Sequence, residues 1–293
     1  MPRSIALVSG AEARHHDTDL SFIVRALGDR GVIAEIVDWD NAATDWSQFE
    51  AAIVRSPWDY HRRYPEFLAW LTKVSAATTL HNSADVIMWN TDKEYLVELA
   101  EAKIPIIPTT YVRSPEDIER ISLEGMLEHD IVVKPTVSAG SNNTERHEES
   151  PVKAAAHLGA LLDAGKIAMV QPYQRFIDER GETGMVYFNG RFSHAFRKGA
   201  ILATGENTKN GLFVEEEITA RDASDEERYI GDDVMRFLNK KFGSLPLYAR
   251  VDVVRGSAGV PVLMELELAE PSFFLHTSRD SAERFAAAVL ARR

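Results

Sequence analysis

Hydrophobic positions in the first third of the chain fall into two patterns that alternate. The apolar runs at 5–9, 32–37 and 51–54 are short enough for buried strands, whereas apolar residues at 20–27 and 64–74 recur at helical spacing. Strands that alternate with helices predict a parallel sheet covered on both faces. Functional residues of such sheets lie just past the carboxyl ends of the strands.

The rest of the chain predicts a different architecture, with antiparallel hairpins. After a linker at 81–90, Thr91-Asp-Lys-Glu94 has the pattern of a capping box and predicts a helix to about Ala102, while the prolines keep 104–108 extended. The further expected elements are strands at 109–112, 131–134 and 168–172, helices at 152–162, 224–242 and 278–290, and two hairpins, one around Asn189-Gly190 and one joining 247–254 to 260–266. The fold class is therefore α/β in the first part and α+β in the second.

Composition limits what the protein can do. The chain has 293 residues, enough for about two domains, and a net charge of −12 that argues against general binding of nucleic acids. It has no cysteine, which excludes disulfides, a thiol nucleophile and Cys-ligated zinc. No apolar stretch approaches the ~18 residues of a membrane span, and the first residues do not match a signal peptide. We therefore expect a cytoplasmic protein with no membrane partner.

The strongest candidate chemistry lies on the last hairpin. Arg250 and Asp252 alternate on one strand and share a face, as do Glu265 and Glu267 on the next strand. Three carboxylates crowded together repel each other unless a cation lies among them. Mg²⁺ prefers oxygen ligands and is usually held by one or two carboxylates plus substrate phosphates. The alternative is a solvated sheet face on which the arginine pairs with the acids.

This hairpin resembles the metal site of the ATP-grasp ligases. That family places an Asp on one strand and Glu-x-Asn on the next, around one or two Mg²⁺, often with an Arg two residues before the Asp. Arg250, Asp252 and Glu265 match the pattern, whereas Glu267 stands where Asn is usual. The resemblance implies an ATP-grasp fold with an N-terminal parallel α/β domain at 1–90, a small lobe at 91–167 and a large lobe at 168–293.

The same resemblance implies a nucleotide site, although each motif alone would be weak. Lys93 and Lys134 would bind phosphates, and the polar loop 136–143 would close over the triphosphate. The remaining residues implied for ATP are Ser138, Gly140 and Ser141 in this loop, Gln171, Pro172 and Tyr173 (through its backbone) at the adenine, and Asp178 or Glu182 at the ribose.

The activity implied is an ADP-forming ligase that uses Mg·ATP, with Mn²⁺ as an acceptable substitute. A small amino-acid-like carboxylate becomes an acyl phosphate, which a nitrogen nucleophile then attacks. Arg250, Lys134 and Arg197 would be catalytic. The substrate residues implied are Arg55, Ser56, Trp58, Asp59, Tyr60, Lys198 and Ser272. Many members of the family are homodimers.

Segments 55–60, 82–90 and 267–274 resemble the branch that includes the O-ureidoserine cyclo-ligase of cycloserine biosynthesis. There the nucleophile belongs to the same molecule, so the product is a ring. Two alternatives remain open: a ligase that joins an amino acid to a second amine, and a regulatory protein that binds nucleotide without catalysis. Arg250 speaks against the second, because a pure binder needs no charge-stabilising arginine.

Two other sets of residues have a simpler interpretation. His15-His16 is expected to be an exposed loop pair rather than a metal site, because neither a cysteine nor a spaced second pair accompanies it. Trp39, Trp70 and Trp89 are expected in the core or in pocket walls. Trp58 is the exception that could face a substrate.

Overall fold

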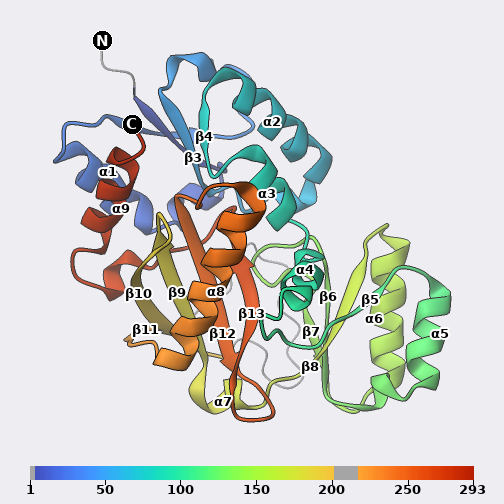
Figure 1. Cartoon of the computed structure of the whole chain (residues 1–293). Helices are drawn as coiled ribbons and strands as arrows, with labels where there is room; N and C mark the ends of the chain where they lie inside the picture. Colours follow the sequence, from blue (N-terminus) through green and yellow to red (C-terminus); the bar gives the residue numbers. More distant parts are fainter. Residues whose placement is uncertain (1–3, 201–216) are drawn as a thin grey trace.

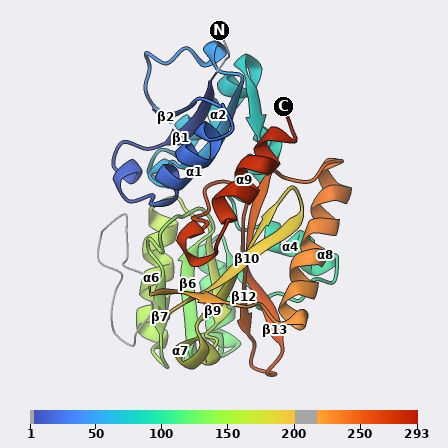
Figure 2. The ribbon, with the colours of Figure 1, turned by 90° about the vertical axis from the view of Figure 1, so that its left-hand side faces the viewer.

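The computed structural model describes residues 4–200 and 217–293, and arranges them around three β-sheets (Figure 1). The N-terminal domain lies above two lobes that face each other (Figure 2). Short 3-10 turns connect several elements, at Ala13–His15, Trp46–Gln48, Tyr60–Arg62, Met126–Glu128 and Leu275–Thr277.

The N-terminal domain is a parallel sheet with helices on both faces, as predicted. Its strands are β1 (Ile5–Ser9), β2 (Ala34–Asp38), β3 (Ala51–Ser56) and β4 (Thr79–His81), in the order β2-β1-β3-β4. Its main helices are α1 (Asp19–Gly28) and α2 (Tyr64–Ala77). Side chains alternate along β1, so Ile5 and Leu7 pack with α1 whereas Ala6 and Val8 pack with α2. The last helix, α9 (Ser281–Leu290), packs beside α1.

The prediction for 81–102 was wrong in detail. The expected linker contains a helix, α3 (Ala84–Asn90), and Thr91 ends that helix instead of starting the next one. The Thr91 hydroxyl bonds the Met88 carbonyl and the Tyr64 hydroxyl, at 3.1 and 3.0 Å, so it is not available to form a capping box. The following helix, α4, spans Tyr95–Glu101 and has no side-chain cap.

The small lobe is an antiparallel sheet with two helices on one face (Figure 1). It comprises β5 (Thr110–Val112), α5 (Pro115–Leu123), β6 (Ile131–Pro135), β7 (Glu145–His147), α6 (Pro151–Asp163) and β8 (Ala168–Pro172). The strand order is β5-β8-β6-β7. Because β8 pairs with β5 and β6, the small lobe extends to Pro172, past the predicted boundary at 167. The pairing partners of β8 could not be read from its own sequence.

The large lobe is an antiparallel sheet that carries the two predicted hairpins. Its elements are α7 (Phe176–Arg180), β9 (Glu182–Phe188), β10 (Arg191–Lys198), β11 (Ile218–Arg221), α8 (Asp225–Phe242), β12 (Tyr248–Arg255) and β13 (Pro261–Glu267), with strand order β11-β10-β9-β12-β13. Asn189 and Gly190 have φ values of 48° and 73°, the left-handed conformation that a tight two-residue hairpin turn requires. Helix α8 begins with a capping box between Ser224 and Glu227.

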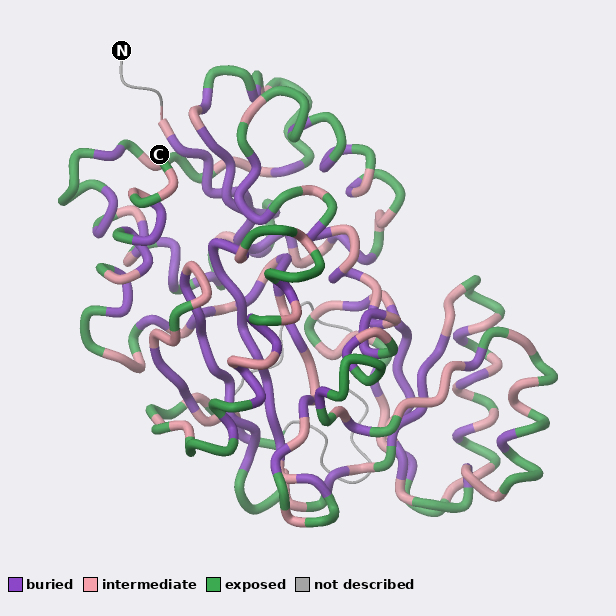
Figure 3. Tube along the Cα trace, in the orientation of Figure 1, coloured by how far each residue is buried: buried purple, intermediate pink, exposed green. Residues whose placement is uncertain are grey.

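The N-terminal domain and the large lobe share a hydrophobic core. One cluster of buried residues joins Leu7 and Leu27 of the N-terminal domain to Phe188 of β9 and to Phe273 and Phe285 near the C-terminus. The connector 104–108 is extended, as predicted, and Ile106 bridges to Leu263 of β13. The central strands β3, β9 and β12 are buried along almost their whole length (Figure 3), whereas the edge strands β2 and β11 are not. Among the described residues, no helix has the length and apolar character needed to cross a membrane.

Candidate active site

A cavity of about 820 Å³ opens where the N-terminal domain and the two lobes meet. Its floor comes from β12 and β13, one wall from the small lobe, and another from the N-terminal domain. Residues of the ATP-grasp pattern that line it are Lys93, Lys134, Ser138, Gly140, Ser141, Gln171, Pro172, Tyr173, Glu182, Lys198, Arg250, Glu265, Glu267 and Ser272. Most of the predicted site therefore converges on one cavity, although its members come from distant parts of the sequence.

The β12–β13 hairpin brings the predicted arginine and carboxylates together on one face. Its register sets Arg250 opposite Glu267 and Asp252 opposite Glu265. Arg250 donates from Nε and Nη2 to the Asp252 carboxylate, at 2.9 and 2.7 Å, and from Nη2 to Glu267. Its Nη1 donates to the Ser272 carbonyl at 3.2 Å. Asp252 lies beneath the cavity surface, whereas both glutamates line it.

Two buried lysines from the small-lobe side face these acids. Lys93 Nζ lies 3.2 Å from Glu265 Oε1 and 3.1 Å from the Ser138 carbonyl, so it links the flap loop to β13. It does not open a helix, but lies in the turn between α3 and α4. Lys134 is buried at the end of β6, and this burial lowers the pKa of its ammonium group. Both lysines can place positive charge against a phosphate chain.

The carboxylates of the cavity are not equally compensated by these cations. Burial acts to raise the pKa of Glu265, but Lys93 and Lys134 outweigh it and leave that pKa at about 2. Burial raises the pKa of Glu267 to about 8, against the opposing effect of Arg250. Burial likewise raises the pKa of Glu182 and of Glu270 to about 7. A set of buried acids short of positive charge suits a bound divalent cation, and oxygen ligands suit Mg²⁺.

Of the residues expected at the adenine and the ribose, Gln171, Tyr173 and Glu182 line the cavity, whereas Asp178 does not. Gln171 is buried and donates from Nε2 to Thr109 Oγ1 at 2.8 Å, while the Tyr173 backbone N–H donates to the Asp130 carbonyl. The Tyr173 carbonyl is therefore the group on that residue suited to an adenine. Glu182 lines the cavity and pairs with Lys198 at 2.7 Å. Asp178 lies outside it on α7, where it accepts a hydrogen bond from the Tyr173 hydroxyl.

Of the predicted substrate residues in the N-terminal domain, only Trp58 and Tyr60 line the cavity. Arg55 is fully buried behind it, and Ser56 hydrogen-bonds Ser9 at 2.9 Å. Asp59 accepts from Trp39 at 3.0 Å and pairs with Arg63. These three side chains are committed to the packing of the domain.

Arg197 also lies away from the cavity. Its Nε donates to the Arg180 carbonyl at 3.0 Å, and its guanidinium pairs with Glu217. Neighbouring residues on a strand point to opposite faces, so only one of Arg197 and Lys198 can reach the cavity, and that residue is Lys198.

Sequence reasoning missed one acidic residue of the site, Glu270. It lines the cavity beside Trp58, whose indole N–H donates to the Glu270 carbonyl at 3.0 Å. The signal available in the sequence was its place in the segment 267–274, three residues after Glu267. His15 and His16 are both exposed, as expected, and His16 reaches the rim of the cavity. Trp39 and Trp70 are in the core, as expected.

Comparisons with known proteins match this chain over nearly its whole length. Residues 5–82 match the family model of the N-terminal domain of D-cycloserine synthetase DcsG. The chain is 37% identical over 295 residues to the cycloserine biosynthesis protein DcsG of Streptomyces lavendulae, covering 98% of each sequence. A crystal structure of D-cycloserine synthetase DcsG superposes with a TM-score of 0.91 at 35% identity, covering 98% of this chain and 99% of that one.

More distant structures share the fold. D-alanyl-alanine synthetase A from Vibrio cholerae superposes with a TM-score of 0.71 at 13% identity, covering 99% of this chain and 97% of that one. The ATP-grasp ligase PsnB, in a structure with Mg and ADP, has a TM-score of 0.64 at 17% identity, covering 98% and 96% of the two chains. The shared fold, together with the extensive identity to DcsG, shows that this chain is an ATP-grasp ligase of the DcsG family.

Proposed function

We propose that the protein is an ADP-forming cyclo-ligase that activates the carboxylate of a small amino-acid-like substrate and closes a ring on a nitrogen of the same molecule. One observation carries the proposal: acids of the β12–β13 hairpin, the two buried lysines and the N-terminal aromatic residues all line one cavity. Extensive identity to a protein named for cycloserine biosynthesis supports the ring-forming version.

In this proposal the small-lobe side and the β12–β13 hairpin contact different parts of Mg·ATP. Lys93, Lys134 and the flap loop 136–143 bind the phosphates, while Glu265 and Glu267 hold Mg²⁺, with Asp252 beneath them. When bound, Mg²⁺ neutralises charge on the phosphates of ATP, the source of the transferred phosphoryl group. Catalysis of this kind rests on positioning and electrostatics, so it requires no protein nucleophile.

Arg250 is placed at the junction of the metal site and the substrate end. Its guanidinium spans from Asp252 to the Ser272 carbonyl, so it can stabilise negative charge on an acyl phosphate and on the tetrahedral intermediate that follows. The acyl phosphate loses phosphate when the substrate nitrogen attacks its carbonyl carbon.

The substrate end is formed by Trp58, Tyr60, Glu270 and Ser272. Glu270 is the acid at this end of the cavity, and its carboxylate can pair with the α-ammonium group of an amino acid. Trp58 and Tyr60 supply flat walls that favour a small, compact molecule. A cavity within the usual range of about 300–1,000 Å³ for ligand sites fits a nucleotide together with such a substrate.

The metal assignment is tested by comparing Glu265→Ala with Glu267→Asn. Asn is the usual family residue at the second position, so Glu267→Asn should keep substantial turnover, because a neutral oxygen ligand suffices there. Glu265→Ala should lose nearly all turnover, about 10³-fold or more, because it removes a ligand on which charge neutralisation of the phosphates depends. ADP release gives the rates, and equal losses in the two variants would contradict the assignment.

Ring closure is tested separately by product analysis. O-Ureidoserine and related O-substituted serines are incubated with Mg·ATP, with and without an added amine. A cyclic product whose yield does not depend on the added amine supports the proposal. A linear amide formed only when the amine is present would show an intermolecular ligase instead.

A further inference from the structure

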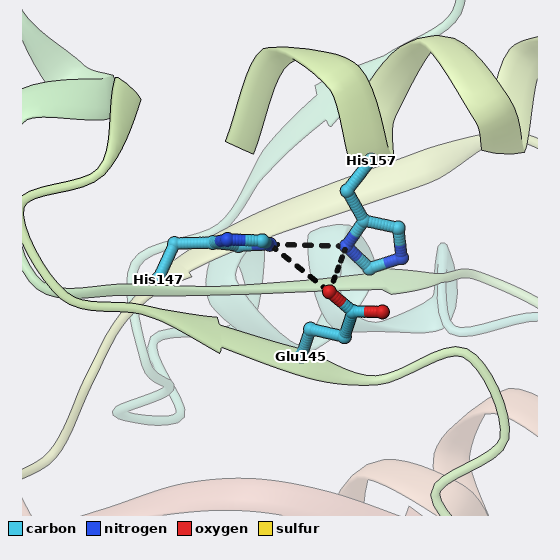
Figure 4. Close-up of side chains that lie close together, drawn as sticks. All are labelled: Glu145, His147 and His157. Carbon is cyan, nitrogen blue, oxygen red and sulfur yellow. Dashed lines mark hydrogen bonds and ion pairs between the residues drawn. The ribbon is translucent and has the colours of Figure 1, made fainter. Parts of the chain in front are cut away.

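Two histidines and a glutamate converge at the edge of the small-lobe sheet, away from the active-site cavity (Figure 4). Glu145 and His147 alternate on the edge strand β7 and share a face. His157 reaches them from α6, which packs over that face. The ring nitrogens His147 Nε2 and His157 Nδ1 are 3.1 Å apart, and Glu145 Oε2 lies 3.8 and 3.9 Å from them.

We propose that Glu145, His147 and His157 form a binding site for one transition-metal dication of the zinc type. The ligand atoms are His147 Nε2, His157 Nδ1 and Glu145 Oε2. Two imidazoles and one carboxylate are a ligand set that proteins use for zinc when a fourth position is left to water. The Glu145 side chain is partly exposed, so solvent can supply that fourth ligand.

The spacing of the three ligand atoms suits zinc. The three separations define a triangle, and one point lies about 2.1 Å from all three of its corners, within the roughly 2.0–2.2 Å range of Zn–N and Zn–O bonds. A hydrogen bond between the rings would account for the nitrogen–nitrogen distance alone. It would not account for the Glu145 oxygen, which is directed at both nitrogens but is too far from each to be hydrogen-bonded.

The protonation states also suit a metal. Burial lowers the pKa of His147 and of His157 against the opposing charge of Glu145, and this direction favours the neutral ring that a metal requires. The charge of Lys153 acts in the same direction on His147. The backbone of Asn143 lies close enough to His157 to raise its pKa.

The proposed metal site lies next to the end of the flap loop. Asn143 ends the flap loop, and the adjacent Thr144 lines the active-site cavity. A bound metal would join β7, α6 and, through His157, the end of the flap. It would be distinct from the Mg²⁺ site, because nitrogen ligands favour zinc-like ions whereas the hairpin offers only oxygen.

The test is a zinc titration of chelator-treated full-length protein in excess Mg²⁺, against a chromophoric chelator. The wild type should bind one Zn²⁺ per chain at this site. His157→Gln and His147→Gln should weaken binding by more than the ~10–100-fold typical of losing an outer-shell partner, because each removes a direct ligand. His129→Gln is the matched control, since His129 is an exposed histidine of the same lobe. Its affinity should equal that of the wild type.

A second set of measurements distinguishes the loss of the metal site from misfolding of a variant. Circular dichroism without metal checks each variant, and Glu145→Gln offers a change at a partly exposed position that the fold should tolerate. Zn²⁺ should raise the melting temperature of the wild type and of His129→Gln, and raise it little in the ligand variants. Unchanged zinc affinity in folded His157→Gln, or no stoichiometric binding by the wild type at micromolar free Zn²⁺, would overturn the proposal.

Discussion

Two buried arginines hold the same loop, and only one of them faces the active-site cavity. Arg55, on β3, donates to the Pro271 carbonyl at 2.9 Å, and its guanidinium lies 3.7 Å from the centre of the Phe273 ring. Arg250, on β12, donates to the Ser272 carbonyl at 3.2 Å. Both therefore hold residues 271–273.

Their remaining partners separate the two arginines. Arg55 lies 4.0 and 3.7 Å from the buried acids Asp17 and Asp19, in a sealed region. Arg250 binds Asp252 and Glu267, and Glu267 lines the cavity. The comparison teaches that an arginine on a strand next to acids is not by itself a sign of catalysis. What matters is whether its acids can reach a ligand.

The loop that follows β13, which both arginines contact, also has a buried side and a side that faces the cavity. On its buried side, Asp19 accepts from the backbone N–H groups of Phe273 and Leu275, at 2.6 and 2.8 Å, and His194 donates to the Phe273 carbonyl at 2.8 Å. On its open side, Glu270 and Ser272 line the cavity. We infer that the buried contacts hold the open side in position for substrate.

The largest expected effect is on stability, from Arg55→Met. Removing one partner of a buried ion pair leaves the other charge uncompensated and costs about 3–5 kcal/mol. Asp17 and Asp19 would be left in that state, so we expect the free energy of unfolding to fall by this amount in urea denaturation. Arg55→Lys retains the charge without the planar fork and should lose less. A loss below about 1 kcal/mol for Arg55→Met would show that Arg55 is not a structural anchor.

Arg250→Met should give the contrasting result, with a loss of turnover rather than of binding. If Arg250 stabilises charge that develops only after attack, kcat should fall by about 10²–10³ while ATP affinity is nearly retained. In Mg²⁺ its effect on stability should be smaller than that of Arg55→Met, because the metal can compensate the acids left behind. Calorimetry and ADP release on one preparation separate these outcomes. Lost Mg·ATP binding would make Arg250 a nucleotide ligand, and full turnover would make it structural.

The smallest expected effect is a dependence of stability on pH that arises from His194. Burial lowers the pKa of His194 to about 4, although its bond to the Phe273 carbonyl acts in the opposite direction. Between pH 6.5 and 4 the unfolded chain therefore binds a proton that the folded chain does not, so stability falls as pH falls through this window. The loss approaches about 3 kcal/mol, at about 1.4 kcal/mol per pKa unit.

This pH dependence can be assigned by substitution. Urea denaturation at several pH values should show a shallower slope between pH 6.5 and 4 in His194→Asn than in the wild type. His61 and His81, whose pKa values burial also lowers to about 4, should keep part of the slope in the variant. Identical slopes in the two proteins would show that folding does not change the pKa of His194.

Local patterns were sufficient where no side chain from another segment competes with them. The alternation of Arg250 with Asp252 and of Glu265 with Glu267 places each pair on one face of its strand, and the Asn189-Gly190 turn fixes the other hairpin. The capping-box prediction at Thr91 failed because its hydroxyl bonds Tyr64, a residue of another helix. Competition of that kind is invisible to a local pattern.

The second limit of prediction from the sequence is that a local pattern does not show which distant segments come together. Nothing in 168–172 says that this strand joins β5 and β6, and nothing in 55–60 says that Trp58 and Tyr60 reach the cavity while Arg55 does not. The cluster of Glu145, His147 and His157 was missed although β7 and α6 follow each other in the chain, because only the packing of α6 against β7 brings His157 to the two residues of the strand.

The sequence by itself determined the type of most of the longer strands and helices, the two hairpins, and a face of charged residues that resembles an ATP-grasp metal site. These follow from side-chain direction along one strand or helix, which the backbone period fixes locally. The tertiary structure alone decided which charged residues are sealed and which can meet a ligand. Charge compensation and burial depend on neighbours from other segments, as Asp19 beside Arg55 and Glu267 beside Arg250 show.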